Sequence, residues 1–424
     1  MDNLYQSFHS YPSHGRHGMP DKLPTQFYTT LDEFELESGQ ILTDATVAFT
    51  IRGRLNASGT NVIVICHALS GSADCFDWWS FLLSGPAKLA IDTTRYCVIC
   101  CNALGSPYGS SSPMCSRPNN TSLYGNDFPK TTIRDDVRIQ KKVLDILGVQ
   151  SVYCVIGGSM GGMQALEWSF FGKHYVRSLA LIATTARQSP WAIAWAENQR
   201  ATIKADAKYR GGGYGDDPPA AGLRAARMAA MLSYRTHLSF EKRFGRRRVD
   251  VKTDSSSRKA RRAAVPGEHH RDKCGTFSAQ SYLRYQGDKF NERFDANCYL
   301  HLLDKIDSHD ISRGRCAGLS DSDAMKEVLG QIQQRALVVG IPTDGLYPLC
   351  EQVALFEGMP NATFATLESE DGHDGFLLEG EQLNDLLSKF FGACPLLEEQ
   401  VGWDKVVELK TQSIITEKEI ISSG

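Results

Sequence analysis

Short apolar runs alternate with longer amphipathic stretches along the first 180 residues of the chain. Residues 61–66 (NVIVIC) are apolar at almost every position, and residues 96–101 and 152–156 follow the same pattern. Strands that are apolar on both faces are typical of parallel sheets that helices cover on both sides. We therefore expect these three runs to be strands of one such sheet.

An amphipathic helix is predicted between the second and third of these runs. Ile133, Val137 and Leu144 fall on one stripe of a helix. Thr132 stands where a capping residue begins a helix, and Gly148 stands where a glycine ends one. The order strand, helix, strand predicts a doubly wound, mostly parallel α/β sheet.

The pattern changes after one more strand-like run at 179–183. Amphipathic helical stretches then follow one another without an intervening strand. We interpret residues 184–330 as a helical insertion that covers the sheet as a lid. Its helices are expected at 191–204, 220–244 and 278–304.

The sheet pattern resumes after the lid. Residues 336–340 and 362–367 predict two further strands, and residues 382–391 predict a closing helix. The core is therefore assigned to residues 31–183 and 331–394. Two flanking segments complete the division of the chain, a flexible lead-in at 1–30 and a polar tail at 395–424.

Residues 245–273 of the lid form a strongly basic segment with almost no apolar side chains. The segment holds ten Lys and Arg residues against four acids. This composition predicts a disordered, solvated loop. An anion-binding or nuclear-localisation patch is the alternative interpretation.

Composition limits the classes of function. The net charge is −3 and 42% of the residues are hydrophobic, which argues against a basic nucleic-acid-binding surface. No run reaches the roughly 18 apolar residues of a membrane span. The first residues lack the apolar core of a secretory signal, so we expect a cytoplasmic protein.

The twelve cysteines do not form a metal-binding or disulfide pattern. Several of them, such as Cys66 and Cys97, lie inside apolar runs, where they behave as small buried hydrophobes in a reducing compartment. No CxxC motif is matched by a second pair of ligands, so no metal is expected.

The strongest chemical signal is Ser159 in the sequence GGSMGG. It lies directly after the predicted strand 152–156 and before the apolar helical stretch MQALEW. A serine in G-x-S-x-G between a strand and a helix is typical of a nucleophile elbow, because the tight turn lifts the hydroxyl above the sheet. Ser159 is therefore the candidate nucleophile.

A serine nucleophile needs a base, and this architecture supplies partners in the chain order Ser, Asp or Glu, His. Asp344 follows the predicted strand 336–340, and His373 follows the strand 362–367. Both positions lie at carboxyl ends of strands, where open α/β sheets gather their functional residues. Asp344 is the predicted acid and His373 the predicted base. Asp371 and Asp374 flank the histidine and remain alternative acids.

An oxyanion hole requires two backbone donors. One is the N–H of the residue after the nucleophile, here Met160, and the other comes from the loop after an earlier strand. The segment HALSG follows the strand 61–66, which makes the Leu69 N–H the second candidate. His67 in this segment is interpreted as a structural residue that is hydrogen-bonded to the loop.

Several further motifs together resemble the fungal homoserine O-acetyltransferases, which have the α/β-hydrolase fold. The resemblance extends over most of the chain and its motifs occur in order. They are HALSGSAD, NALGSPYGSSSP, TTIRDDVR, GGSMGGMQALEW, SYLRYQGDKF, RFDANCY and GHDGFLLE.

The resemblance implies the transfer of an acetyl group from acetyl-CoA to L-homoserine through an acetyl-serine, in a step towards methionine. It implies a cytoplasmic homodimer with no bound cofactor besides the acetyl-CoA substrate. Arg227 and Asp374 match the substrate contacts of the family, and Tyr234 is expected to line the pocket. A guanidinium suits the carboxylate of homoserine, and a carboxylate suits its ammonium group.

Other activities remain compatible with these residues. An acetyltransferase that acts on a secondary-metabolite hydroxyl, such as one resembling deacetylcephalosporin C acetyltransferase, would share the serine, histidine and aspartate. A succinyl-CoA donor is a further alternative within the family. A plain serine esterase or thioesterase is the alternative from another class.

Overall fold

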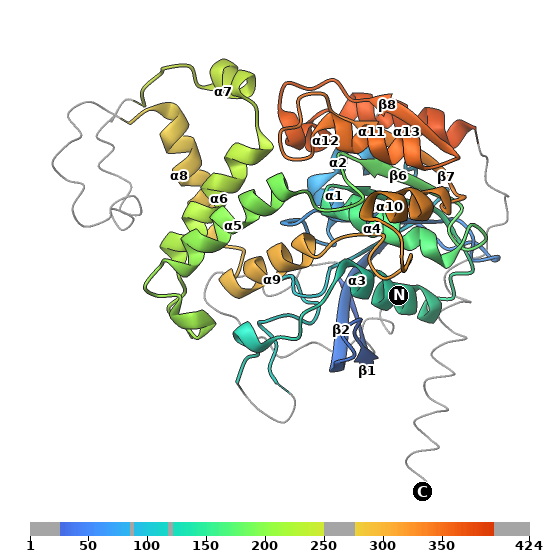
Figure 1. The fold of residues 1–424 in the computed structure, drawn as a ribbon, viewed down its shortest axis with the longest axis horizontal. Coiled ribbons are helices and arrows are strands. Elements are labelled where there is room, and N and C mark those ends of the chain that lie inside the picture. The colour runs from blue at the N-terminus through green and yellow to red at the C-terminus, as the bar shows by residue number, and fades with distance from the viewer. Residues whose placement is uncertain (1–25, 85–88, 118–121, 250–275, 394–424) are drawn as a thin grey trace, which may run out of the picture.

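The computed structural model describes residues 26–84, 89–117, 122–249 and 276–393. Within these residues, eight strands form one sheet in the order β1-β2-β4-β3-β5-β6-β7-β8 (Figure 1). The strands from β4 to β8 in this order run parallel, whereas β1 and β2 are antiparallel to their neighbours. The predicted mostly parallel, doubly wound sheet is therefore confirmed. The strands are β1 (Phe27–Glu35), β2 (Ile41–Arg52), β3 (Val62–Cys66), β4 (Cys97–Cys101), β5 (Val152–Gly158), β6 (Ser178–Ile182), β7 (Arg335–Gly340) and β8 (Ala362–Thr366).

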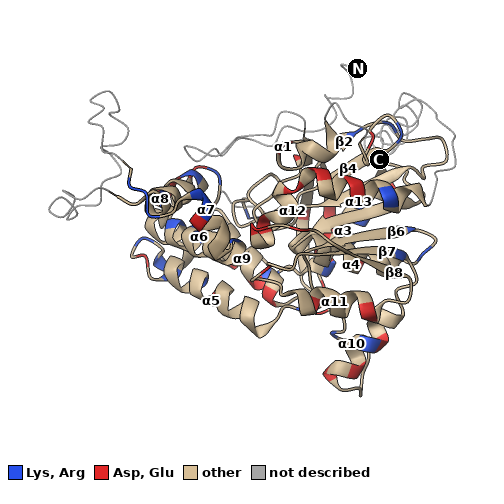
Figure 2. Ribbon diagram, turned by 90° about the horizontal axis from the view of Figure 1, so that it is seen from above, with Lys and Arg blue, Asp and Glu red and all other residues tan. Residues whose placement is uncertain are grey.

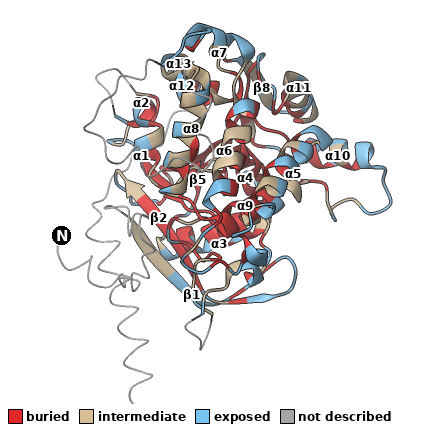
Figure 3. Cartoon of the chain, turned by 90° about the vertical axis from the view of Figure 1, so that its left-hand side faces the viewer, coloured by how far each residue is buried: buried red, intermediate tan, exposed pale blue. Residues whose placement is uncertain are grey.

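Helices cover both faces of the sheet, and alternate residues of a strand pack into different cores. Val64 of β3 belongs to the apolar cluster shared with α3 and α4, whereas Ile65 belongs to the cluster on the opposite face with α13. The central strands are accordingly buried, and the outer helices expose one side (Figure 3). The helices of the core are α1 (Cys75–Trp78), α2 (Ser80–Leu83), α3 (Ile133–Ile146), α4 (Met160–Trp168), α10 (Asp321–Gly330), α11 (Leu349–Gly358), α12 (Gly375–Leu378) and α13 (Gly380–Gly392). Helix α10 falls inside the segment 184–330 that was expected to form the lid, but its Val328 and Leu329 pack into the same apolar cluster as β7.

Helix α3 begins where its capping residue was predicted. The Thr132 side chain accepts a hydrogen bond from the Asp135 N–H, and the Asp135 side chain accepts one from the Thr132 N–H. This reciprocal pair satisfies two backbone donors that a helix start otherwise leaves unpaired. Gly148 follows the helix with a φ of 81°, a conformation that favours glycine.

The helical insertion forms a separate layer beside the sheet (Figure 1). The sequence predicted three long helices at 191–204, 220–244 and 278–304, and the second and third are wrong because each is broken. Thr236 accepts a hydrogen bond from the Ser239 N–H, and Asp295 accepts one from the Cys298 N–H, so each starts a new helix. The lid helices are α5 (Pro190–Lys204), α6 (Ala220–Tyr234), α7 (His237–Arg243), α8 (Ser278–Asn291) and α9 (Ala296–Asp307).

The predicted lead-in at 1–30 ends earlier than expected. Strand β1 begins at Phe27, which pairs with Phe49 of β2, and the two rings lie 5.9 Å apart. Pairing with β2 orders these residues although their own sequence carries no strong strand pattern. Most of the basic segment 245–273 and the tail 395–424 lie outside the described residues.

A buried ion pair ties the lid to the core. The Lys305 Nζ of α9 lies 2.6 Å from Asp136 Oδ1 of α3, and both side chains are fully buried. The same ammonium donates to the Leu104 carbonyl at 2.7 Å, while the Leu104 N–H donates to Asp136. Burial raises the pKa of Asp136 to about 6, although Lys305 opposes this shift. The pair thus fixes α9 against the loop that follows β4.

We expect Lys305→Met to lower the free energy of unfolding by about 3–5 kcal/mol, because Asp136 then remains buried without its partner. The double variant Lys305→Met/Asp136→Leu should recover part of this loss, since no buried charge remains unpaired. Urea unfolding followed by circular dichroism measures both. Lys208→Met, which removes an exposed partner of Asp217, is the control and should change stability little. Equal effects of Lys305→Met and Lys208→Met would contradict the prediction.

Candidate active site

Ser159 lies on a sharp turn between β5 and α4. Its backbone has a φ of 58° and a ψ of −126°, which is unusual for a residue other than glycine. The turn is tight on both sides: a Cβ at Gly157 would lie 2.0 Å from the Gly161 carbonyl oxygen, and a Cβ at Gly161 would lie 2.1 Å from that of Cys66. The glycines of the GGSMGG sequence are therefore required for the turn that presents the serine.

Ser159, His373 and Asp344 form one continuous chain of hydrogen bonds. His373 Nε2 lies 2.9 Å from Ser159 Oγ, and His373 Nδ1 lies 2.7 Å from Asp344 Oδ2. All three residues are buried. Because an ionised carboxylate only accepts, Nδ1 carries a proton and Nε2 is free to accept the Ser159 proton.

The backbone of the following loop fixes the Asp344 carboxylate. The N–H groups of Leu346 and Tyr347 both donate to Asp344 Oδ1 at 2.9 Å. The Gln352 Nε2 lies 3.4 Å from Asp344 Oδ2 and also donates to the Tyr347 carbonyl at 2.6 Å. These contacts orient the carboxylate towards His373. Gln352 was not identified from the sequence, where a glutamine in a helix carries no distinguishing pattern.

Arg235 pairs with both of the alternative acids. Its Nε lies 2.8 Å from Asp374 Oδ2, and its Nη1 pairs with Asp371 Oδ1. Neither carboxylate is hydrogen-bonded to the His373 ring, whereas Asp344 is. Burial lowers the pKa of His373, but the negative charges of Asp344 and Asp374 outweigh burial and raise it above its ordinary value.

Arg235 is the main residue of the site that sequence analysis missed. It follows α6 in the lid, and it is separated from Asp371 by 136 residues in the chain. Beside it, the Ser239 Oγ donates to Asp371, and the Thr236 Oγ donates to the Glu370 carbonyl. The lid is therefore hydrogen-bonded to the loop that carries His373. No local pattern marks a contact between such distant segments.

The two candidate oxyanion donors lie beside the serine. Met160 is the first residue of α4, so its N–H has no partner within the helix. Leu69 lines the same hollow as Ser159. His67 has the structural position that was predicted: its Nε2 accepts from the Ala103 N–H at 2.9 Å, and its Nδ1 lies 2.8 Å from the Ala68 carbonyl. Burial lowers its pKa to about 4, which keeps the ring neutral.

Arg227, Tyr234 and Asp374 come together around His373. The Tyr234 ring centroid lies 5.8 Å from that of His373, and the Arg227 guanidinium lies 5.8 Å from the Tyr234 ring. The Arg227 Nη1 is buried, and no hydrogen-bond acceptor faces it in the described residues. Burial raises the pKa of Asp374, which Arg235, His373 and Arg227 partly oppose. An unpartnered guanidinium and a carboxylate thus lie within one small region.

Two hollows lie beside these groups. A small one, of about 40 Å³, contains Ser159, Leu69 and Tyr234 and extends between α5 and α9. A larger one, of about 330 Å³, extends from the loop beside Leu69 towards α8 and includes Arg227. The hydroxyl of Ser159 is therefore reached through space under the lid.

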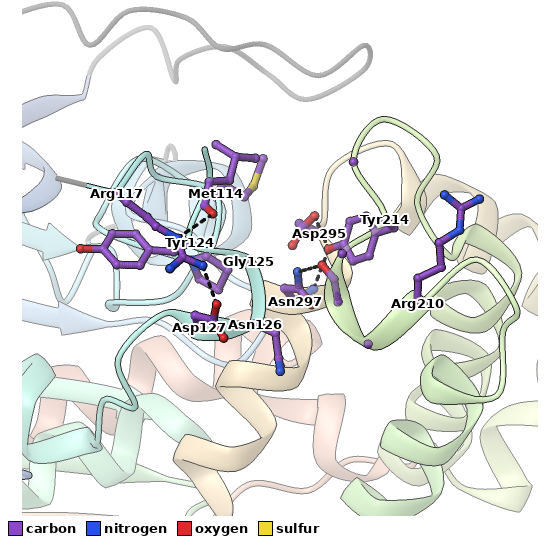
Figure 4. A pocket seen from close by; sticks show the side chains of 16 residues that line it. Met114, Arg117, Tyr124, Gly125, Asn126, Asp127, Arg210, Tyr214, Asp295 and Asn297 are labelled. Atoms are coloured by element: carbon purple, nitrogen blue, oxygen red, sulfur yellow. Dashed lines mark hydrogen bonds and ion pairs between the residues drawn. The ribbon is translucent and has the colours of Figure 1, made fainter. Parts of the chain in front are cut away.

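A third cavity, of about 440 Å³, lies between the loops 113–127 and 210–215 (Figure 4). It does not include the residues predicted from the sequence. Its two arginines are neutralised by neighbouring acids, because Arg117 pairs with Asp127 at 2.5 Å and Arg210 with Asp217 at 3.3 Å. This cavity does not belong to the candidate active site.

Among the described residues, no helix is both long enough and apolar enough to cross a membrane. In the same part of the chain, no group of three or more His, Cys, Asp or Glu side chains is arranged to hold a metal ion.

Comparisons with known proteins agree with this architecture. Residues 61–379 match the family model described as the alpha/beta hydrolase fold. A homoserine O-acetyltransferase of Emericella nidulans is 46% identical, over 86% of each chain. The structure of a homoserine O-acetyltransferase from Staphylococcus aureus matches with a TM-score of 0.66 and 30% identity, over 88% of this chain and 97% of the other. Esterase E22 matches with a TM-score of 0.73 and 24% identity, over 86% of this chain and 99% of the other, which shows the shared fold.

The match to the fungal relative decides the family, because it covers 86% of this chain at 46% identity. The chain belongs to the homoserine O-acetyltransferase family, within the alpha/beta hydrolase fold.

Proposed function

We propose that this protein transfers the acetyl group of acetyl-CoA to the hydroxyl of L-homoserine, releasing CoA and O-acetyl-L-homoserine. The observation that carries the proposal is the hydrogen-bonded chain from Ser159 through His373 to Asp344, beside the unpartnered Arg227 guanidinium. The names of the relatives support the same acceptor.

In the first half-reaction, Ser159 Oγ attacks the thioester carbonyl while its proton passes to His373 Nε2. The negative charge that develops on the carbonyl oxygen is assigned to the N–H groups of Met160 and Leu69. As the carbon–sulfur bond breaks, the proton on His373 passes to the departing sulfur and CoA leaves as a thiol. Asp344 stabilises the imidazolium that forms between these two steps.

In the second half-reaction, the homoserine hydroxyl gives its proton to His373 Nε2 and attacks the acetyl-serine. The ester bond to Ser159 breaks, and the same proton returns to Ser159 Oγ. We assign the homoserine carboxylate to Arg227 and its ammonium group to Asp374, with Tyr234 in the pocket wall. The lid excludes water and orients the acceptor, so transfer is favoured over hydrolysis.

The proposed reaction draws on no resident cofactor, and acetyl-CoA enters as a substrate. We place the reaction in the cytoplasm, where the cysteines in apolar runs stay reduced.

We also propose a homodimer that packs through the lid. Large apolar side chains exposed on the lid helices support this assembly: Trp191 is 53%, Leu232 49%, Leu238 54% and Tyr285 59% exposed. Sedimentation equilibrium tests it, and a monomer at micromolar concentration would contradict it.

The release of free CoA from acetyl-CoA, measured with and without L-homoserine, tests the proposed reaction. We expect release that depends on homoserine, with O-acetylhomoserine identified by mass spectrometry. A succinyl-CoA reaction run in parallel distinguishes the two donors. CoA release that is indifferent to homoserine would instead indicate a thioesterase, and a stable acetyl-serine would indicate another acceptor.

Arg227→Ala should weaken the use of the acceptor without preventing acylation. We expect kcat/KM for homoserine to fall by about 10²–10³-fold, because the guanidinium–carboxylate contact is lost from a buried site. Acetylation of Ser159 by acetyl-CoA alone, followed by mass spectrometry, should remain. Arg224→Ala, which changes a neighbouring arginine of α6 that pairs with Asp288, is the matched control. Loss of the acetyl-enzyme in Arg227→Ala would overturn this assignment.

The rate of acylation should depend on the protonation of His373. A protonated ring cannot accept the Ser159 proton, and the pKa of His373 is raised above its ordinary value. We therefore expect kcat/KM for acetyl-CoA to fall as the pH is lowered, with a midpoint above about 6.5. Initial rates from about pH 5.5 to about 9.5 measure it. A midpoint below that of an ordinary histidine would contradict the geometry of the chain from Asp344 to Ser159.

A further inference from the structure

Several charged side chains line the hollow of about 330 Å³ beside the catalytic groups. One wall is the loop at 68–72 with Trp78, and the other is the lid helix α8 with the residues that follow it. Figure 2 shows Lys and Arg residues gathered on α7 and α8, at the outer end of the lid. The charged residues of the hollow are Arg227, Lys289, Arg293 and Asp77.

The hollow lies next to the catalytic groups. Ala68 and Ser70, which line it, stand on either side of Leu69 in the chain. Arg227 marks its inner end, because its guanidinium lies 5.8 Å from the Tyr234 ring, which in turn lies 5.8 Å from the His373 ring. This hollow is therefore a neighbour of the one that Ser159 and Tyr234 line.

Arg293 is a fixed cation in the wall. Its Nη1 donates to the Ser70 carbonyl at 2.9 Å and to the Tyr108 hydroxyl at 2.5 Å, and its guanidinium lies 5.2 Å from the Phe290 ring. These partners are neutral, so its charge is not compensated. Trp78 is also fixed, because its Nε1 donates to the Ser72 carbonyl at 2.9 Å.

The cations of this hollow lack acidic partners. Arg227, Lys289 and Arg293 form no ion pair with any carboxylate in the described part of the chain. Among the described residues that line the hollow, Asp77 is the one acid, which leaves an excess of two positive charges. By contrast, both arginines of the cavity in Figure 4 are paired with aspartates. Unpaired cations in a hollow favour an anionic ligand.

We propose that the outer part of this hollow binds the phosphate groups at the nucleotide end of the acyl-CoA donor, through Lys289 and Arg293, with the Trp78 ring against the rest of that arm. The assignment rests on the proposed function, because it requires a CoA thioester to acylate Ser159. Arg227 stays with the acceptor at the inner end. Since CoA leaves before homoserine reacts, both substrates use the same opening in turn.

Comparison of two thioesters tests this assignment. Acetyl-CoA carries the phosphates, and S-acetyl-N-acetylcysteamine presents the same acetyl thioester without them. For Lys289→Glu at low ionic strength, we expect the ratio of kcat/KM for acetyl-CoA to that for the truncated thioester to fall about tenfold. Added salt should shrink this difference, because it screens exposed charges. Lys204→Glu, an exposed lysine at the end of α5 outside this hollow, is the matched control and should leave the ratio unchanged.

The outcomes separate this assignment from the proposed function. Suppose that acetyl-CoA acetylates Ser159, but Lys289→Glu lowers kcat/KM for both thioesters equally or changes their ratio no more than Lys204→Glu does. The phosphate site is then overturned, while the proposed reaction stands. If neither thioester acetylates Ser159, the proposed function fails and the phosphate site fails with it.

Discussion

Replacing Ser159 with alanine is expected to lower kcat for acetyl transfer by about 10⁵-fold or more, because no other group in the hydrogen-bonded chain can form the acyl intermediate. The hydroxyl lies 2.9 Å from His373 Nε2, which is within reach for direct proton transfer. Alanine removes this hydroxyl and leaves the backbone of the turn unchanged. The fold should therefore survive.

Release of free CoA and mass analysis of the enzyme after exposure to acetyl-CoA measure this effect. The wild type should gain one acetyl group at Ser159, and Ser159→Ala should gain none. Ser178→Ala is the matched control, since it removes another buried serine hydroxyl, which donates to the Tyr153 carbonyl in the sheet. Turnover that persists in Ser159→Ala would remove Ser159 as the nucleophile.

Asp344→Asn should lower kcat by about 10⁴-fold, although the substitution changes few atoms. The carboxylate accepts from His373 Nδ1 at 2.7 Å and thereby holds the proton on that nitrogen. An amide cannot stabilise the imidazolium in the same way, and it favours the tautomer whose Nε2 no longer accepts the Ser159 proton. The loss should appear in both half-reactions, because His373 takes a proton in each.

The corresponding change at Asp371 tests one of the two acids that the sequence left as alternatives to Asp344. Asp371 pairs with Arg235 and is not hydrogen-bonded to the His373 ring. Asp371→Asn should therefore retain kcat within about tenfold of the wild type, since Asp371 contacts Arg235 and Ser239 of the lid rather than the reacting groups. Steady-state rates of both variants give the comparison. A larger loss in Asp371→Asn than in Asp344→Asn would reverse the assignment.

Local features of the sequence anticipated much of the site. The glycines around Ser159 admit only a tight turn, and the apolar runs before it and before Asp344 place both residues at the ends of strands. The motifs shared with the family then indicated Arg227 and Asp374. The structure places these two side chains near His373, but it also shows Asp374 paired with Arg235, which the sequence did not predict.

The helices of the lid show where local pattern is insufficient. Apolar periodicity continues through 220–244 and 278–304, so it predicted unbroken helices. In the structure, the side chains of Thr236 and Asp295 hydrogen-bond to backbone N–H groups three residues later and start new helices. At Arg235 the chain also turns so that the guanidinium reaches Asp371 and Asp374. Local capping side chains thus start a new helix at both breaks, and at the first break the ion pairs of Arg235 with the histidine loop accompany the change of direction.

The sequence by itself determined the sheet, the turn at Ser159 and the order of the catalytic candidates, because strand pattern, glycine sterics and strand-end position are local properties. Only the tertiary structure decided which acid is hydrogen-bonded to His373, which cations lack an acidic partner and how the lid contacts the loop that carries His373. Those properties depend on residues that are distant in the chain, which are 29 positions apart for Asp344 and His373, 136 for Arg235 and Asp371, and 169 for Lys305 and Asp136. Their contact energies arise only after the chain has folded and desolvated the charges.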